Sequence, residues 1–157
     1  MSLRFALGAG VLLLAAFAGC IAEQLEPDVG ELRAGVCKPL DSDPTSEVSF
    51  KDDVLPLFER TPDKGPGCSC HLPSSPRAIG LELTGLDLST YAGTMRGGDN
   101  TADMNVVPGD PCSSILLQKI TGAPPFGSRM PSNGPPVFSP REQTLLSDWI
   151  AEGANDN

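Results

Sequence analysis

Gly67-Cys68-Ser69-Cys70-His71 is the stretch of sequence around which the rest of this chain is arranged. It contains two of the five cysteines of the chain and its only histidine. Thiolate sulfur is both a nucleophile and a metal ligand, and imidazole nitrogen is the commonest metal ligand among side chains. We therefore expect the chemistry of this protein to be concentrated in these five residues.

The nearest mechanistic template for this stretch is the C-x-x-C-H motif. In that motif two cysteine sulfurs form thioether bonds with the vinyl groups of a haem, and the adjacent histidine binds the haem iron. Here only Ser69 separates the two cysteines, so the motif is one residue shorter than the template. Because Cys70 and His71 remain adjacent, a thioether bond from Cys70 with His71 as iron ligand is the firmer half of the prediction. The spacing leaves open whether Cys68 forms a second thioether bond.

The composition indicates one small domain with extensive loops. The chain has 157 residues, of which 17 are glycine and 16 are proline, and aromatic residues make up only 5%. So few large apolar side chains can form only a small core, which a flat apolar cofactor would complete. The formal net charge of −9 disfavours binding to nucleic acid or to anionic lipid headgroups. It favours a partner protein with a basic docking face.

The N-terminus has the features of a bacterial lipoprotein signal peptide over residues 1–19. Arg4 precedes an uncharged, mainly apolar run over residues 5–17, which is shorter than the roughly 20 residues needed to span a bilayer. The run ends in Phe17-Ala18-Gly19-Cys20, which resembles a lipobox with phenylalanine where leucine is more usual. We expect lipidation at Cys20 and an extracytoplasmic protein held at the periplasmic or outer-membrane face. An ordinary cleaved signal and an uncleaved anchor are the alternatives.

Residues 20–47 then form an acidic tether, and a folded domain is expected over residues 48–157. Ser49 is expected to cap the first helix of the domain, and Pro56 is expected to kink this helix or end it early. The apolar residues expected on the buried face of this helix are Phe50, Val54, Leu57 and Phe58.

Three further helices and one extended segment are expected after the motif. The alternating apolar residues at 80–83 predict a short extended segment, and residues 87–95 predict a short helix ended by glycine. Asp110 and Pro111 are expected to start a helix that ends at Gly122. The last helix is the best signalled, since it starts with the capping box Ser139-Pro140-Arg141-Glu142 and has Gly153 as its stop. Its expected buried face consists of Leu145, Leu146, Trp149 and Ile150.

Five short segments between residues 50 and 154 follow one another in an order typical of one protein family. In chain order they are Val54-Leu55-Pro56-Leu57, Gly80-Leu81-Glu82-Leu83, the Val-Pro-Gly-Asp-Pro turn at 107–111 with Ser114 and Leu116, Arg129-Met130-Pro131, and Trp149-Ile150 with Gly153-Ala154. In these segments the chain resembles small c-type cytochrome domains of the planctomycete cytochrome type. Each segment alone is weak, but the five in this order are fairly specific.

The resemblance implies a mainly α, class I-like cytochrome c fold, with a few short helices around one haem and long loops rich in glycine and proline. It implies haem c bound through Cys68, Cys70 and His71, with Met130 as the distal iron ligand. Iron ligated on both faces has no open position, so the protein is expected to be an electron carrier between redox proteins and not an enzyme. Haem-based side activity would require iron without its methionine ligand.

The remaining cysteines bear on two alternatives. With Cys20 lipidated and two cysteines on haem, Cys37 and Cys112 remain and are expected to form a disulfide in an oxidising compartment. One alternative is a structural zinc site that combines Cys68, Cys70 and His71 with either of them. The other is a disulfide-stapled lipoprotein without haem that binds other proteins. A visible absorption spectrum separates the three hypotheses.

Overall fold

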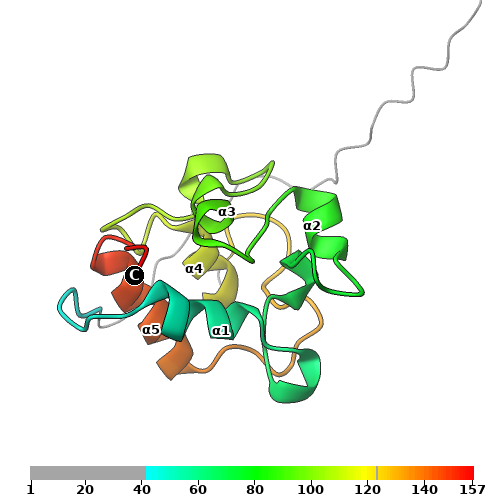
Figure 1. The fold of residues 1–157 in the computed structure, drawn as a ribbon, viewed down its shortest axis with the longest axis horizontal. Helices are drawn as coiled ribbons and strands as arrows, with labels where there is room; N and C mark the ends of the chain where they lie inside the picture. The colour runs from blue at the N-terminus through cyan, green and yellow to red at the C-terminus, as the bar shows by residue number, and fades with distance from the viewer. Residues whose placement is uncertain (1–41, 123) are drawn as a thin grey trace, which may run out of the picture.

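The computed structural model describes residues 42–122 and 124–157. Within these ranges the chain forms five short α-helices, one short π-helix and three 3₁₀ helices, and it contains no β-strand (Figure 1). The predicted mainly α class is therefore confirmed. The predicted signal peptide and the cysteines Cys20 and Cys37 lie outside the described residues. None of the described helices has the length and apolar character needed to cross a membrane.

The first helical segment joins the π-helix η1 (Phe50–Val54) directly to α1 (Leu55–Phe58). Ser49 caps it as predicted, because its Oγ accepts a hydrogen bond of 3.1 Å from the backbone N–H of Asp52. Pro56 lies in the first turn of α1, and the helix ends two residues later. The predicted buried face is also confirmed: Phe50, Val54, Leu57 and Phe58 are all buried.

Helix α5 (Pro140–Ala151) packs against this first segment. Its predicted capping box is present, with Ser139 Oγ accepting from the N–H of Glu142 at 3.3 Å and Glu142 Oε2 accepting from the N–H of Ser139 at 2.7 Å. Trp149 is fully buried, and its ring centroid lies 5.4 Å from that of Phe50. The two ends of the domain sequence therefore meet in one aromatic core.

The predicted extended segment at residues 80–83 is wrong, because these residues lie in helix α2 (Ile79–Thr84). Gly85 ends this helix in the left-handed conformation, with φ of 62°, and donates its N–H to the carbonyl of Leu81. Apolar alternation over four residues cannot distinguish a strand from a helix, so the glycine stop was the more informative signal.

Helix α3 (Tyr91–Arg96) starts later than the predicted position at Asp87. Thr90 is the cap, since its Oγ1 accepts from the N–H of Gly93 at 3.0 Å. Asp87 instead accepts two hydrogen bonds from Ser89 in a turn, one from the backbone and one from the side chain. An aspartate before a serine favours such a turn as strongly as it favours a helix cap.

Helix α4 (Ile115–Thr121) shows the same shift. It follows Ser114 and not Asp110, whose carboxylate accepts from the N–H and the hydroxyl of Ser113. Gly122 ends the helix as predicted, with φ of 96°. Asp110 therefore accepts hydrogen bonds from a residue three positions later, as a helix cap would, but these bonds close a turn that precedes the helix.

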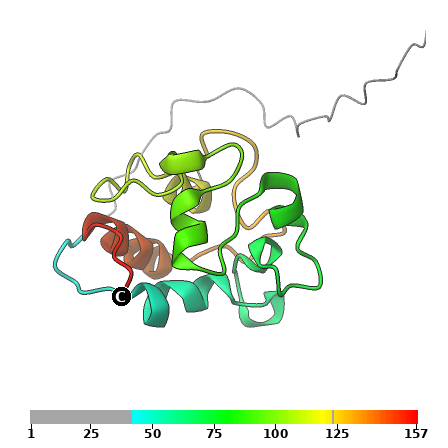
Figure 2. The same ribbon diagram turned by 45° about the horizontal axis from the view of Figure 1, so that its top comes forward.

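The elements separate into two ends of the molecule. In both views α5 and the first helical segment lie at one end, while α2 lies at the other with the 3₁₀ helix η3 (Ser69–His71) against it (Figures 1 and 2). The long loop between α4 and α5 passes between the two ends, drawn in orange. Residues 42–48, the last part of the expected tether and the first residue of the domain, run beside α5: the N–H of Asp43 donates to Asp148 Oδ1 at 2.7 Å, and that of Val48 to Glu152 Oε2 at 2.9 Å.

Candidate functional site

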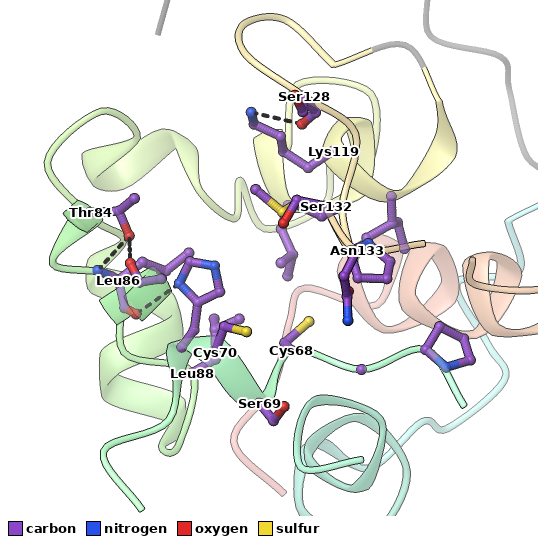
Figure 3. Close-up of a pocket in the computed structure, with 18 of the residues that line it drawn as sticks. Cys68, Ser69, Cys70, Thr84, Leu86, Leu88, Lys119, Ser128, Ser132 and Asn133 are labelled. Atoms are coloured by element: carbon purple, nitrogen blue, oxygen red, sulfur yellow. Dashed lines mark hydrogen bonds between the residues drawn. The ribbon is translucent and has the colours of Figure 1, made fainter. Parts of the chain in front are cut away.

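A mainly apolar cavity of about 500 Å³ lies between α2, η3 and the long loop (Figure 3). Ligand pockets usually have volumes of about 300–1,000 Å³. Residues from all three parts line it, and they include Cys68, Cys70, His71 and Met130. The structure thus brings together in one cavity the four residues that the sequence analysis selected for cofactor binding.

The two cysteines lie on one side of this cavity and face the loop that carries Ser132 and Asn133 (Figure 3). Cys68 is buried, and its backbone N–H donates to the carbonyl of Phe58 at 2.9 Å. Burial raises the pKa of its thiol to about 12, with a smaller contribution from the neighbouring Cys70. Both thiols are free, and Cys70 is partly exposed. The motif therefore presents one shielded and one more accessible sulfur.

The imidazole of His71 is oriented by a backbone carbonyl. Its Nδ1 lies 3.3 Å from the carbonyl oxygen of Leu86, which can only accept a hydrogen bond. In the neutral ring Nδ1 therefore carries the proton, and Nε2 keeps the lone pair that a metal ion binds. Burial lowers the pKa of His71, although the bond to Leu86 acts in the opposite direction, so the ring stays neutral at pH 7.

Helix α2 packs directly on this ring at Gly80. A Cβ atom at residue 80 would lie 2.8 Å from His71 Nε2 and 2.9 Å from the carbonyl oxygen of Cys70. Only glycine allows the helix to approach so closely. The same helix carries two apolar side chains, Ile79 and Leu83, that line the cavity and are 57% and 54% exposed. An apolar group in the cavity would cover them.

The loop that leads to the motif is fastened to α5 through Arg60. Its guanidinium donates to the carbonyl of Pro66 at 3.2 Å and forms an ion pair with Glu142. Burial by itself raises the pKa of Glu142, but hydrogen bonds from Ser139 and Arg60 outweigh it, so the pKa lies below its usual value. A Cβ atom at Gly67 would lie 2.2 Å from the carbonyl oxygen of Arg60, so this close approach requires glycine.

Met130 lies in the long loop and lines the cavity. Its backbone N–H donates to the carbonyl of Lys119 at 2.8 Å, and Arg129 Nε donates to the carbonyl of Ile120 at 3.0 Å. The end of α4 therefore fixes the position of this part of the loop. Of the three methionines in the described ranges, Met130 is the one that lines the cavity, whereas Met95 and Met104 do not.

Lys119 is a cavity residue that the sequence analysis missed. Its Nζ donates to the carbonyls of Phe126 and Ser128, the latter at 3.3 Å, and lies 4.1 Å from the centroid of the Phe126 ring (Figure 3). Burial lowers its pKa. Its position three residues after Leu116 indicates only that it lies beside the buried face of the helix, not that it lines a cavity.

Cys112 is disulfide-bonded, whereas Cys68 and Cys70 are free. Its predicted partner Cys37 lies outside the described residues, so this pairing stays a prediction. A sulfur in a disulfide is not a thiolate, so Cys112 cannot serve as the fourth ligand of the zinc site considered above. In the described part of the chain, no three or more His, Cys, Asp or Glu residues are grouped so that they could hold a metal ion.

No protein-family model matches this chain, and no curated protein matches it. What this chain can bind is therefore inferred from the side chains that line the cavity. It combines two thiols, a neutral imidazole and a thioether sulfur in apolar surroundings. Thiols can be alkylated by vinyl groups, and imidazole with thioether sulfur is a ligand pair of haem iron.

Proposed function

We propose that this protein is a membrane-anchored, extracytoplasmic c-type cytochrome with a small class I-like cytochrome c fold. It transfers electrons through a covalently attached haem. The observation that supports the proposal is the convergence of Cys68, Cys70, His71 and Met130 on one apolar cavity. These four residues come from a short loop motif and from a second loop far along the chain.

The residues of the cavity fit the group. Cys70 and Cys68 supply sulfur for thioether bonds, His71 supplies Nε2, and Met130 supplies its thioether sulfur. The carbonyl of Leu86 holds the imidazole in the tautomer required for iron binding. The exposed apolar side chains of α2 lie where an apolar ring would cover them.

When bound, haem iron supplies a centre that changes between the ferrous and ferric states. The side chains of this protein set the conditions for that change. His71 and Met130 would both bind the haem iron, which would leave no open site for a substrate, and a methionine ligand would favour the reduced form. Leu116, Ile120 and Phe126 line the cavity with apolar atoms that limit the access of water. Outer-sphere electron transfer follows, and no enzymatic reaction is proposed.

The proposed partners are redox proteins with a basic docking face. The chain has 20 acidic and 11 basic residues, so its net charge attracts such a surface and repels nucleic acid. Lipidation at Cys20 would hold the domain at a membrane. Because salt screens the attraction between the acidic domain and a basic partner, their association rate would fall as ionic strength rises.

The decisive experiment is expression of the full chain in bacteria that contain the machinery for c-type haem attachment. We expect a red protein with a sharp absorption band in the reduced state and a mass increased by one haem, with the haem on the peptide that contains Cys70. A single Cys68→Ser variant reports whether a second thioether bond exists. Colourless protein of unaltered polypeptide mass, apart from lipid, would exclude the proposal. Zinc content would then separate the zinc module from the disulfide-stapled lipoprotein.

The distal ligand has its own test. Ferric haem ligated by methionine sulfur has a weak long-wavelength absorption band, which we expect in the wild-type protein and not in Met130→Ala. Met104→Ala is the matched control, because Met104 is 50% exposed and does not line the cavity. A band that persists in Met130→Ala would rule out Met130 as the ligand, whatever the haem content.

A further inference from the structure

Lys119 is a cation in the wall of the cavity, and no carboxylate among the described residues pairs with it. Its ammonium group donates to the carbonyls of Phe126 and Ser128 and lies over the ring of Phe126. These contacts fix its position, but carbonyl and ring dipoles do not neutralise its charge. Among residues 42–122 and 124–157 the one ion pair joins Arg60 to Glu142.

The other described residues that line the cavity provide no negative charge to balance that of Lys119. Arg60 is the other basic side chain that lines the cavity, and it is already paired with Glu142. Within the described ranges no aspartate or glutamate lines the cavity, although the chain contains 20 acidic residues. A partly buried charge is retained at low cost only where an opposite charge meets it. The wall is therefore complementary to an occupant that carries a carboxylate.

The position of Lys119 matches the chemistry of haem. Figure 3 shows Lys119 and Ser128 at the end of the cavity away from Cys68 and Cys70. In haem the two vinyl groups and the two propionate groups lie on opposite edges of the ring. Thioether bonds at the cysteines therefore direct the carboxylate edge toward the end of the cavity that contains Lys119.

We propose that the ammonium group of Lys119 pairs with a propionate carboxylate of the haem. This inference rests on the proposed function and deepens it, because it assigns the residue that recognises the anionic edge of the ring. The pair would resemble the charge-assisted hydrogen bonds that proteins use for carboxylates. Because a nearby positive charge disfavours the ferric state, its loss lowers the midpoint potential.

The test uses full-length, haem-loaded protein whose haem carries ¹³C at the two propionate carboxylate carbons. Redox-induced infrared difference spectra then report those two groups alone. In Lys119→Gln, which keeps a donor for the loop carbonyls but removes the charge, we expect one labelled carboxylate band to shift and the midpoint potential to fall. The matched control is Lys64→Gln, because Lys64 is exposed and does not line the cavity. It should leave both quantities unchanged.

Each outcome is decisive. Wild-type protein without covalently attached haem overturns the proposed function and this pairing together. Haem-loaded Lys119→Gln with wild-type bands and potential overturns the pairing alone. Should Lys119→Gln fail to mature, Lys119→Arg takes its place, because a planar guanidinium binds a carboxylate in a different geometry and must shift the same band. An unchanged band in Lys119→Arg overturns the pairing.

Discussion

The Nδ1 atom of His71 lies 3.3 Å from the carbonyl oxygen of Leu86. This contact fixes the imidazole from one side, and helix α2 closes on it from the other side at Gly80. A backbone carbonyl and the backbone of a helix therefore both restrict the orientation of the ring. The bond to Leu86 selects the tautomer in which Nε2 carries the lone pair that a metal ion binds.

The close packing at Gly80 leads to a first prediction. In an exposed helix Gly→Ala stabilises by about 1 kcal/mol. Here the added methyl group would press on the His71 ring and on the backbone of Cys70, and overpacking of this kind costs about 1–3 kcal/mol. We therefore expect Gly80→Ala to lower the free energy of unfolding, measured by urea denaturation and circular dichroism.

The control for this variant is Glu82→Ala, an exposed position in the same helix. It should change the free energy of unfolding by less than about 0.5 kcal/mol, as surface substitutions usually do. A Gly80→Ala protein that is more stable than the wild type would show that α2 does not pack on the ring as described.

Glu142 provides a prediction of pH dependence. Its folded-state pKa lies below its usual value of 4.5, because the hydrogen bonds from Ser139 and Arg60 outweigh burial. A depressed pKa contributes stability that is present above the unfolded-state pKa and is lost as the pH falls through the folded-state value. Glu142→Gln keeps a residue that suits the capping box but removes the charge.

We therefore expect Glu142→Gln to be less stable than the wild type at pH 7 by about 0.2–1 kcal/mol, the range for ion pairs at protein surfaces. The difference should shrink as the pH is lowered below about 4.5 and should fall with added salt. Urea denaturation at several pH values measures it, with Glu82→Gln as control. A difference that stays constant down to pH 2 would contradict a role for the charge.

The two free thiols should differ in reactivity. Because burial raises the pKa of Cys68 to about 12, this thiol stays protonated at pH 8, and only thiolate reacts rapidly with iodoacetamide. In protein made without haem-attachment machinery, we expect alkylation of the partly exposed Cys70 and protection of Cys68 until urea is added. Peptide mass spectrometry measures the alkylated fraction of each cysteine. Equal rates in the folded protein would show that Cys68 is accessible.

The disulfide at Cys112 gives a prediction of stability. Loss of a native disulfide from a small exported domain typically costs about 2–5 kcal/mol. We expect Cys112→Ser to lower the free energy of unfolding by this amount and to release one additional thiol. Peptide mapping without reduction should recover Cys112 joined to Cys37. Recovery of Cys112 with a different cysteine would refute that pairing but not the stabilisation.

The sequence was most informative where a cap residue and an apolar face agreed. At Ser49 and at the capping box of Ser139 and Glu142, both signals indicated the same helix start, and both starts are confirmed. The other two helices were expected to begin at Asp87 and Asp110, but they begin at Tyr91 and Ile115. Because aspartate stabilises turns and helix starts by the same kind of hydrogen bond, the first turns of these two helices were misplaced.

The sequence predicted only those parts of the site in which a side chain supplies the reactive or ligating group. The motif and the Met130 loop indicated four residues that now line one cavity. The carbonyl of Leu86 could not be predicted, because every residue has a carbonyl and only the fold selects one. Gly80 and Lys119 depend on how α2 and the long loop pack, and local spacing carries little information about that packing.

The course of residues 42–48 beside α5 has a consequence for how the protein would stand on a membrane. This segment enters the domain at the end away from α2 in both views (Figures 1 and 2). With a lipid on Cys20, the tether would join the folded domain at that end. The cavity between α2 and the long loop lies away from this junction, so the tether would leave that part of the domain open to a diffusing donor or acceptor.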